Sequence, residues 1–93
     1  MDNTAMHFHV IEQAGLRQAE FGKLVKVSRV TVNNWVRGRG AVDRRHCDKV
    51  MRVLAAIQSA LDAADFPLSK DLSKAERERQ VVTTITTHLK ARK

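Results

Sequence analysis

One short segment of the chain combines residue types that can contact nucleotide bases. Residues 27–40 read VSRVTVNNWVRGRG. Helical geometry, at about 100° per residue, gives this segment two faces. The face that we expect to be buried consists of Val32, Trp35 and Val36. The opposite, exposed face consists of Val30, Asn33, Asn34 and Arg37, with Arg29 on its flank.

The exposed face suits the reading of base edges in the major groove of DNA. Arginine can bond to O6 and N7 of guanine, asparagine can bond to N6 and N7 of adenine, and an apolar side chain can touch the thymine methyl group. This interpretation gives the exposed Val30 a role. The alternative is a solvated helix face that happens to include one valine.

A preceding helix must hold this segment in place. The pattern predicts a helix that begins near Arg17 or Gln18 and breaks around Lys26 and Val27. Its apolar residues at helical spacing are Phe21, Leu24 and Val25. Ser28 then offers a side-chain oxygen to the unpaired N–H groups at the start of the next helix.

A spaced set of residues runs through both helices: Gln18, Phe21, Gly22, Val27, Ser28, Val32, Trp35 and Gly38. This set resembles the helix-turn-helix of Cro/cI-type (Xre-like) transcriptional regulators of phages and plasmids. The resemblance is close over residues 16–40 and looser in the flanking helices. It implies sequence-specific binding to double-stranded DNA, as a repressor that occupies a palindromic operator.

The resemblance also assigns roles to particular residues. The residues expected at base edges are Arg29, Val30 and Asn34, with Asn33 beside them. The residues expected at the DNA backbone are Arg17, Gln18, Ser28, Thr31, Arg37 and Arg39. Among these, Gln18 and Thr31 follow from the resemblance, whereas Arg37 and Arg39 follow from the exposed face and from charge.

Two residues depart from the family pattern. Lys26 occupies a turn position where the family usually has glycine, and a left-handed conformation costs a non-glycine residue about 1 kcal/mol. Arg17 stands where the family often has a Ser, Thr or Asn helix cap, although a basic side chain can still meet a phosphate. We therefore expect a slightly re-shaped turn. The sequence does not decide how the N-terminus of the second helix is capped.

Helical periodicity extends to both sides of the motif. Residues 4–14 are expected to form a first helix, with Met6, Val10 and Ile11 on one side and Gly15 as its left-handed cap. Residues 42–64 are expected to form a long core helix, which Phe66-Pro67-Leu68 must end. The stripe of that helix consists of Cys47, Val50, Leu54, Ile57, Leu61 and Ala64, widened by Val53 and Ala60.

The last segment carries conflicting signals. Ser73 and Glu76 have the spacing of a capping box, and Val82, Ile85 and Leu89 continue at helical spacing. Against this, VVTTITT at 81–87 is a run of β-branched residues, which is typical of a strand. We predict a helix and keep a strand as the alternative. The fold class is then mainly α, a bundle of about five helices that contains a helix-turn-helix.

Charge points to a polyanionic partner. The 93 residues include 17 Lys and Arg against 10 Asp and Glu, a net charge of +7. Residues 17–45 alone hold eight basic and two acidic side chains. We expect double-stranded DNA as the partner; RNA stays an alternative, although single-strand readers usually display more aromatic residues than this chain has.

A single recognition helix discriminates poorly, so a homodimer on two half-sites is expected. The candidate dimerisation residues are Val82, Ile85 and Leu89, in a C-terminal segment (67–93) that follows a DNA-binding domain (1–66). The exposed side of the region around Val53, Ile57, Ala60 and Leu61 is a second candidate surface. The tail can instead fold back on its own domain. Other functions left open are an antitoxin-like protein whose C-terminal segment binds a protein partner, and an excisionase-like DNA-bending factor.

Other chemistry finds little support in the sequence. His7 and His9 would point about 200° apart on a helix, so they do not suit one metal ion. Cys47, next to His46, follows the apolar stripe and is expected to be a small buried residue, and as the only cysteine it has no internal partner. We expect no enzymatic activity, no metal and no cofactor, and a cytoplasmic protein without a secretory leader or membrane span.

Overall fold

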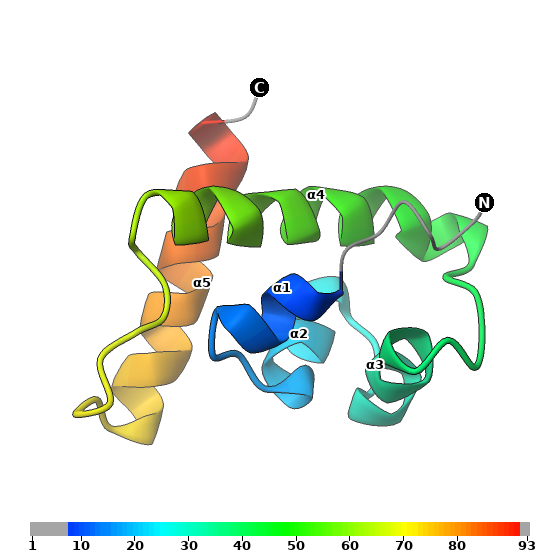
Figure 1. Cartoon of the computed structure of the whole chain (residues 1–93), viewed down its shortest axis with the longest axis horizontal. Coiled ribbons are helices and arrows are strands. Elements are labelled where there is room, and N and C mark those ends of the chain that lie inside the picture. The colour runs from blue at the N-terminus through cyan, green and yellow to red at the C-terminus, as the bar shows by residue number, and fades with distance from the viewer. Residues whose placement is uncertain (1–7, 92–93) are drawn as a thin grey trace.

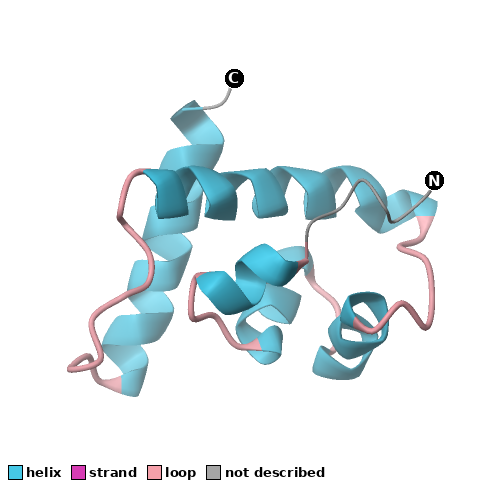
Figure 2. Cartoon of the chain, viewed as in Figure 1, coloured by secondary structure: helices cyan, strands magenta, loops and turns pink. Residues whose placement is uncertain are grey.

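Residues 8–91, the part of the chain that the computed structural model describes, contain five helices joined by turns and loops, and no strand (Figures 1 and 2). The helices are α1 (His9–Gln13), α2 (Gln18–Val25), α3 (Arg29–Val36), α4 (Arg44–Asp62) and α5 (Lys74–Ala91). The predicted mainly α class is confirmed. Met6 and the other residues of the predicted first helix before Phe8 lie outside the described residues.

Three of the helices end in the same local motif. After α1, Gly15 has a φ of 70°, its N–H donates to the carbonyl of Glu12, and the N–H of Leu16 donates to that of Ile11. This pair of bonds satisfies carbonyl groups that the helix end leaves without a partner. The residues at the corresponding left-handed positions after α3 and α4 are Gly38 and Ala64. Ala64 was predicted to continue the apolar stripe of α4, which is wrong, because the helix has already ended there and the side chain is exposed.

The long helix α4 is the centre of the core, and α1, α2 and α5 all pack on it (Figure 1). Its buried side chains are Cys47, Val50, Val53, Leu54, Ala56, Ile57 and Ala60. These positions recur at steps of three and four, so one stripe faces the smaller helices. The sequence-based expectation that Val53, Ile57 and Ala60 offer an exposed dimer surface is wrong, since each is at most 1% exposed.

The last segment is a helix, and it packs on its own chain. Ser73 caps α5 by accepting a hydrogen bond from the N–H of Glu76 at 3.2 Å. Val81 and Ile85 are buried and belong to the same core as α4, and Leu89 packs against it half-buried. Burial at every fourth residue outweighs the strand propensity of the β-branched run, because a helix brings these three residues to one face.

Candidate DNA interface

The turn between α2 and α3 is tight, and two residues make it possible. Lys26 adopts the left-handed conformation that its place in the motif requires, with φ 62° and ψ 45°. A Cβ atom added to Gly22 would lie 2.6 Å from the carbonyl oxygen of Val27, so only glycine lets the turn approach α2 this closely. The turn therefore keeps its left-handed residue although glycine is missing from that position.

The N-terminus of α3 is capped as the sequence predicted. Ser28 has an extended backbone, and its Oγ accepts a hydrogen bond from the N–H of Thr31 at 3.1 Å. The hydroxyl groups of the two residues also share a hydrogen bond of 3.0 Å. The local sequence therefore sets where α3 begins, and with it which side chains of the helix face outward.

The buried face of α3 is narrower than the sequence suggested. Val32 is fully buried, and Trp35 is buried with its ring centroid 6.2 Å from that of Phe8 and 6.4 Å from that of His46. Val36 is 42% exposed, so its prediction as a buried residue is wrong. It lies in the last turn of α3, at the edge of the buried face, where it lines a shallow groove with Leu16 and Gln18.

The outward face of α3 carries the predicted base-contacting residues. Val30 is 61% exposed, the most exposed large apolar side chain of the described residues, and Arg29 is exposed beside it. Asn33 and Asn34 are half-buried. The Nδ2 of Asn33 donates to Oε1 of Gln18, the first residue of α2, at 3.1 Å. The first turn of α2 and the recognition helix are thus joined by a side-chain bond.

The N-terminus of α2 is capped by a side chain of the helix itself, which answers how the helix begins without a Ser, Thr or Asn at position 17. Arg17 has no side-chain acceptor to offer, but its own N–H donates to Oε1 of Glu20 at 2.7 Å. This is the reciprocal half of a capping box. Arg17 remains exposed, so its guanidinium is on the surface beside Gln18.

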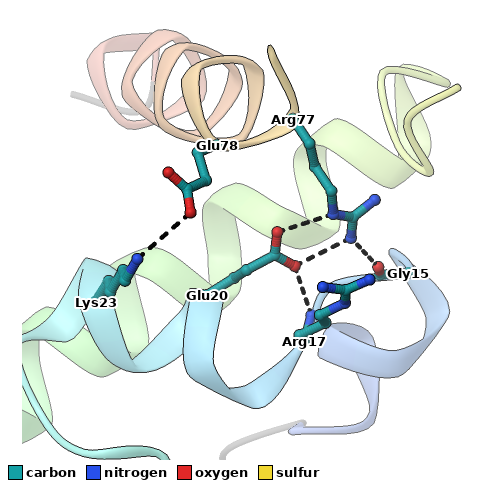
Figure 3. Close-up of polar contacts among 6 residues, drawn as sticks. All are labelled: Gly15, Arg17, Glu20, Lys23, Arg77 and Glu78. Carbon is teal, nitrogen blue, oxygen red and sulfur yellow. Dashed lines mark hydrogen bonds and ion pairs between the residues drawn. The ribbon is translucent and has the colours of Figure 1, made fainter. Parts of the chain in front are cut away.

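A second arginine, Arg77 of α5, completes this arrangement (Figure 3). Its Nε donates to Oε2 of Glu20 at 2.8 Å, and one of its terminal nitrogens donates to Oε1 at 3.0 Å and also to the carbonyl oxygen of Gly15. Both side chains are largely buried, 21% exposed for Arg77 and 13% for Glu20. The fork of the guanidinium thus matches the carboxylate in a bidentate pair.

The protonation of Glu20 reflects these contacts. Partial burial is the largest single influence on its pKa and raises it. The hydrogen bonds from Arg77 and from the N–H of Arg17, with the charges of both arginines, outweigh burial together and hold the pKa below its ordinary value of 4.5. Glu20 is therefore ionised at neutral pH. The pKa of Arg77 is raised, first by its hydrogen bond to Glu20.

The loop after α3 presents basic side chains on an ordered backbone. Gly38 has a φ of 72°, and the N–H of Arg39 donates to the carbonyl oxygen of Asn34 at 2.8 Å. Arg37 and Arg39 are both exposed. The loop leads to Asp43, whose Oδ1 caps α4 by accepting from the N–H of His46 at 3.1 Å. Arg39 is therefore held at its backbone while its side chain stays at the surface.

The residues proposed for dimerisation have different surroundings. Val82 is 53% exposed, whereas Ile85 is 1% exposed and Leu89 is half-buried against the core. Ile85 is therefore buried inside the single chain and is not available at its surface for a partner. Beside Val82, an apolar groove between α2 and α5 is lined in part by Ala19, Leu24, Leu72 and Val81.

The described part of the chain gives two further findings about sites. Within residues 8–91, no three His, Cys, Asp or Glu side chains gather as metal ligands. Cys47 is buried and unpaired, in keeping with the small core residue that the sequence indicated. His7 lies outside the described range. No helix in that range has the length and apolar character needed to cross a membrane.

The sequence indicated the recognition helix but not the ion pair between Glu20 and Arg77. Glu20 could have been noticed three residues after Arg17, which is the spacing of a capping box. The partnership of Glu20 with Arg77 had no such signal, because the two residues are 57 positions apart. Pairs at that separation meet only through the packing of α5 on the rest of the chain.

Comparison with known proteins supplies the family. The helix-turn-helix family matches residues 10–57, just over half of the 93 residues. Searches of curated proteins and of solved structures gave no match. A domain of this family implies sequence-specific DNA binding by a regulator of transcription, and its members are typically not enzymes. With α2, the left-handed turn and α3 placed as described, the chain belongs to the Cro/cI-type helix-turn-helix family.

Proposed function

We propose that the protein is a transcriptional repressor that binds a palindromic operator as a homodimer. The observation that carries the proposal is the outward face of α3, where an exposed valine stands among arginine and asparagine side chains. One exposed valine alone is common on protein surfaces, but this combination of side chains is complementary to the donors, acceptors and methyl groups of base edges.

The contacts divide into two kinds in this proposal. Arg29, Val30 and Asn34 read base edges, and Asn33 lies next to them. The groups that hold phosphates, and so fix the register of the protein on the duplex, are Arg17, Gln18, Ser28, Thr31, Arg37 and Arg39. Phosphate contacts supply much of the affinity and make it sensitive to salt, whereas base contacts supply the selectivity.

A second copy of the chain is needed for a selective regulator. Two-fold dimers of helix-turn-helix proteins bind half-sites one helical turn apart, or a whole multiple of it. In our proposal the C-terminal segment (67–93) provides the contact, with exposed Val82 at its centre and half-buried Leu89 near its end. Supporting this, α5 lies at the opposite end of the molecule from α3, so pairing through α5 leaves both recognition helices uncovered (Figure 1).

Selection from a pool of random duplexes at near-physiological salt tests the proposal. A palindromic consensus is expected, and sedimentation of the complex should give two chains per selected duplex. Transcription in vitro from a promoter that overlaps the consensus should then fall as protein is added. A consensus without two-fold symmetry, bound by one chain, would refute the dimer, and increased transcription would refute repression.

A further inference from the structure

The carboxylate of Glu20 accepts three hydrogen bonds. Its Oε1 accepts from the N–H of Arg17 and from Arg77, and its Oε2 accepts from Nε of Arg77. Arg77 in turn reaches the carbonyl oxygen of Gly15, at the end of α1 (Figure 3). One ion pair therefore joins the end of α1, the first turn of α2 and the C-terminal helix.

The turn that this pair holds is the one with predicted contacts to DNA. Arg17 and Gln18 stand at its start, and Gln18 also accepts the hydrogen bond from Asn33 on the recognition helix. A displacement of this turn by about 1 Å would disturb hydrogen bonds to phosphate, because their donor–acceptor distances span only about half an ångström. Affinity for DNA therefore depends on what fixes the turn.

We propose that Glu20 and Arg77 are positioning residues for DNA binding, which hold the first turn of α2 so that Arg17 and Gln18 meet the DNA backbone. The inference rests on the proposed function. Neither side chain has to touch DNA, since each is largely buried in the contact with the other. The C-terminal helix thus contributes to DNA binding through one guanidinium.

A purely structural ion pair between α2 and α5 is the competing explanation, and the chain contains a comparison for it. Lys23 and Glu78 join the same two helices at 3.5 Å, but their side chains are 73% and 47% exposed (Figure 3). Lys23 lies in the last turn of α2, away from Arg17 and Gln18. Glu78→Gln therefore removes the same charge and an α2–α5 contact without touching the first turn.

The two Glu→Gln variants are expected to differ in their effect on DNA affinity. Glutamine has only one acceptor oxygen, so Glu20→Gln must turn an NH₂ group either toward Nε of Arg77 or toward both the N–H of Arg17 and a terminal nitrogen of Arg77. We expect it to weaken binding about tenfold, the loss of roughly one good hydrogen bond to phosphate. Glu78→Gln should leave affinity unchanged or raise it slightly, because both variants remove a negative charge from a DNA-binding protein.

The probe is a mixed-sequence duplex of about 30 base pairs at low salt, because backbone contacts do not depend on sequence. Each variant is also measured in a second background that carries Arg17→Ala and Gln18→Ala. If Glu20 acts through these two residues, Glu20→Gln should change affinity less than about twofold in that background. A general loss of stability would instead weaken binding equally in both backgrounds.

Arg77→Lys is the second variant, since it keeps the charge but loses the planar fork. It should weaken binding in the same direction as Glu20→Gln and show the same dependence on Arg17 and Gln18. All binding is measured at a temperature where the fluorescence of Trp35 shows each variant to be folded.

The outcomes separate the inference from the proposed function. Equal affinities for Glu20→Gln and Glu78→Gln, or equal losses in the two backgrounds, would overturn the positioning role while DNA binding stands. Failure of the wild-type protein to bind the duplex at low salt would overturn the proposed function itself.

Discussion

Two neighbouring asparagines on α3 differ in what surrounds them. The Nδ2 of Asn33 donates to Gln18, which ties its amide to the first turn of α2. Asn34 is one position further around the helix, and its carbonyl oxygen accepts from the N–H of Arg39. The resemblance placed Asn34 at base edges and Asn33 beside it, but the bond from Asn33 to Gln18 had no sequence signal, because the two residues are 15 positions apart. We therefore expect Asn34 rather than Asn33 to read a base.

Replacing Asn34 by alanine tests that difference. Asn34→Ala should cost about 1–3 kcal/mol of binding free energy on the selected operator and little on mixed-sequence DNA, since a base contact is specific. Asn33→Ala is the matched comparison and should weaken binding to both, because it releases Gln18 from its partner. Titration of both duplexes with each variant gives the answer, and equal losses for Asn34→Ala on the two would rule out its reading role.

The close approach of the turn to Gly22 predicts that adding one carbon atom there destabilises the fold. Gly22→Ala places a Cβ 2.6 Å from the carbonyl oxygen of Val27, which is backbone and cannot move aside cheaply. We expect the free energy of unfolding to fall by about 1–3 kcal/mol, although alanine favours helices. Gly40→Ala is the control, since nothing lies within 4 Å of its added Cβ. Denaturation by urea measures both, and an unchanged midpoint for Gly22→Ala would contradict the close approach.

At the level of elements, helix starts and stops were predictable where a local signal exists. Ser28 and Ser73 cap α3 and α5, and Gly15 and Gly38 follow α1 and α3, as their residue types suggested. The predictions failed where the outcome depended on neighbouring elements. Val36 has the phase of a buried residue but is 42% exposed at the edge of the buried face. Ile85 was expected to contact a partner chain and is buried in the chain's own core.

The loop between α3 and α4 yields a prediction about salt. If the exposed Arg39 meets a phosphate, Arg39→Ala should weaken binding to all duplexes similarly and reduce the slope of log affinity against log salt by about one. The backbone of the loop should be unaffected, because the bond from the N–H of Arg39 to Asn34 does not involve its side chain. Affinities measured across a range of salt decide the matter, and an unchanged slope would place Arg39 away from the DNA.

For the molecule as a whole, the sequence indicated five helices and a basic motif but not how the tail is joined to the rest. The tail was expected as a separate dimerisation segment, yet Val81 and Ile85 share one core with α4, and Arg77 pairs with Glu20 on α2. This arrangement depends on contacts between distant positions, which neither periodicity nor capping residues reveal. The division into a DNA-binding part (1–66) and a dimerisation segment (67–93) stays a prediction about function, because the two parts share one core.

The ion pair between the tail and α2 also predicts a dependence of stability on pH. The pKa of Glu20 is lowered in the folded chain, so its contribution is present above the ordinary value of 4.5 and is lost as pH falls below it. The difference in unfolding free energy between the wild type and Glu20→Gln should therefore be largest at neutral pH and shrink toward about pH 3. Asp43, whose pKa is lowered chiefly by its hydrogen bond to His46, is present in both proteins and cancels. A difference that stays constant with pH would show that the charge of Glu20 adds nothing.

A competition experiment tests most directly whether α3 reads DNA sequence. The affinity of the wild-type protein is measured for the duplex selected from a random pool and for a scrambled duplex of the same composition, at about 0.15 M salt. We predict that the selected duplex binds about a thousandfold more tightly or better, the usual margin of specific over non-specific binding. Equal affinities that vanish together as salt rises would contradict the account, because only the basic charge of the chain would then be acting on DNA.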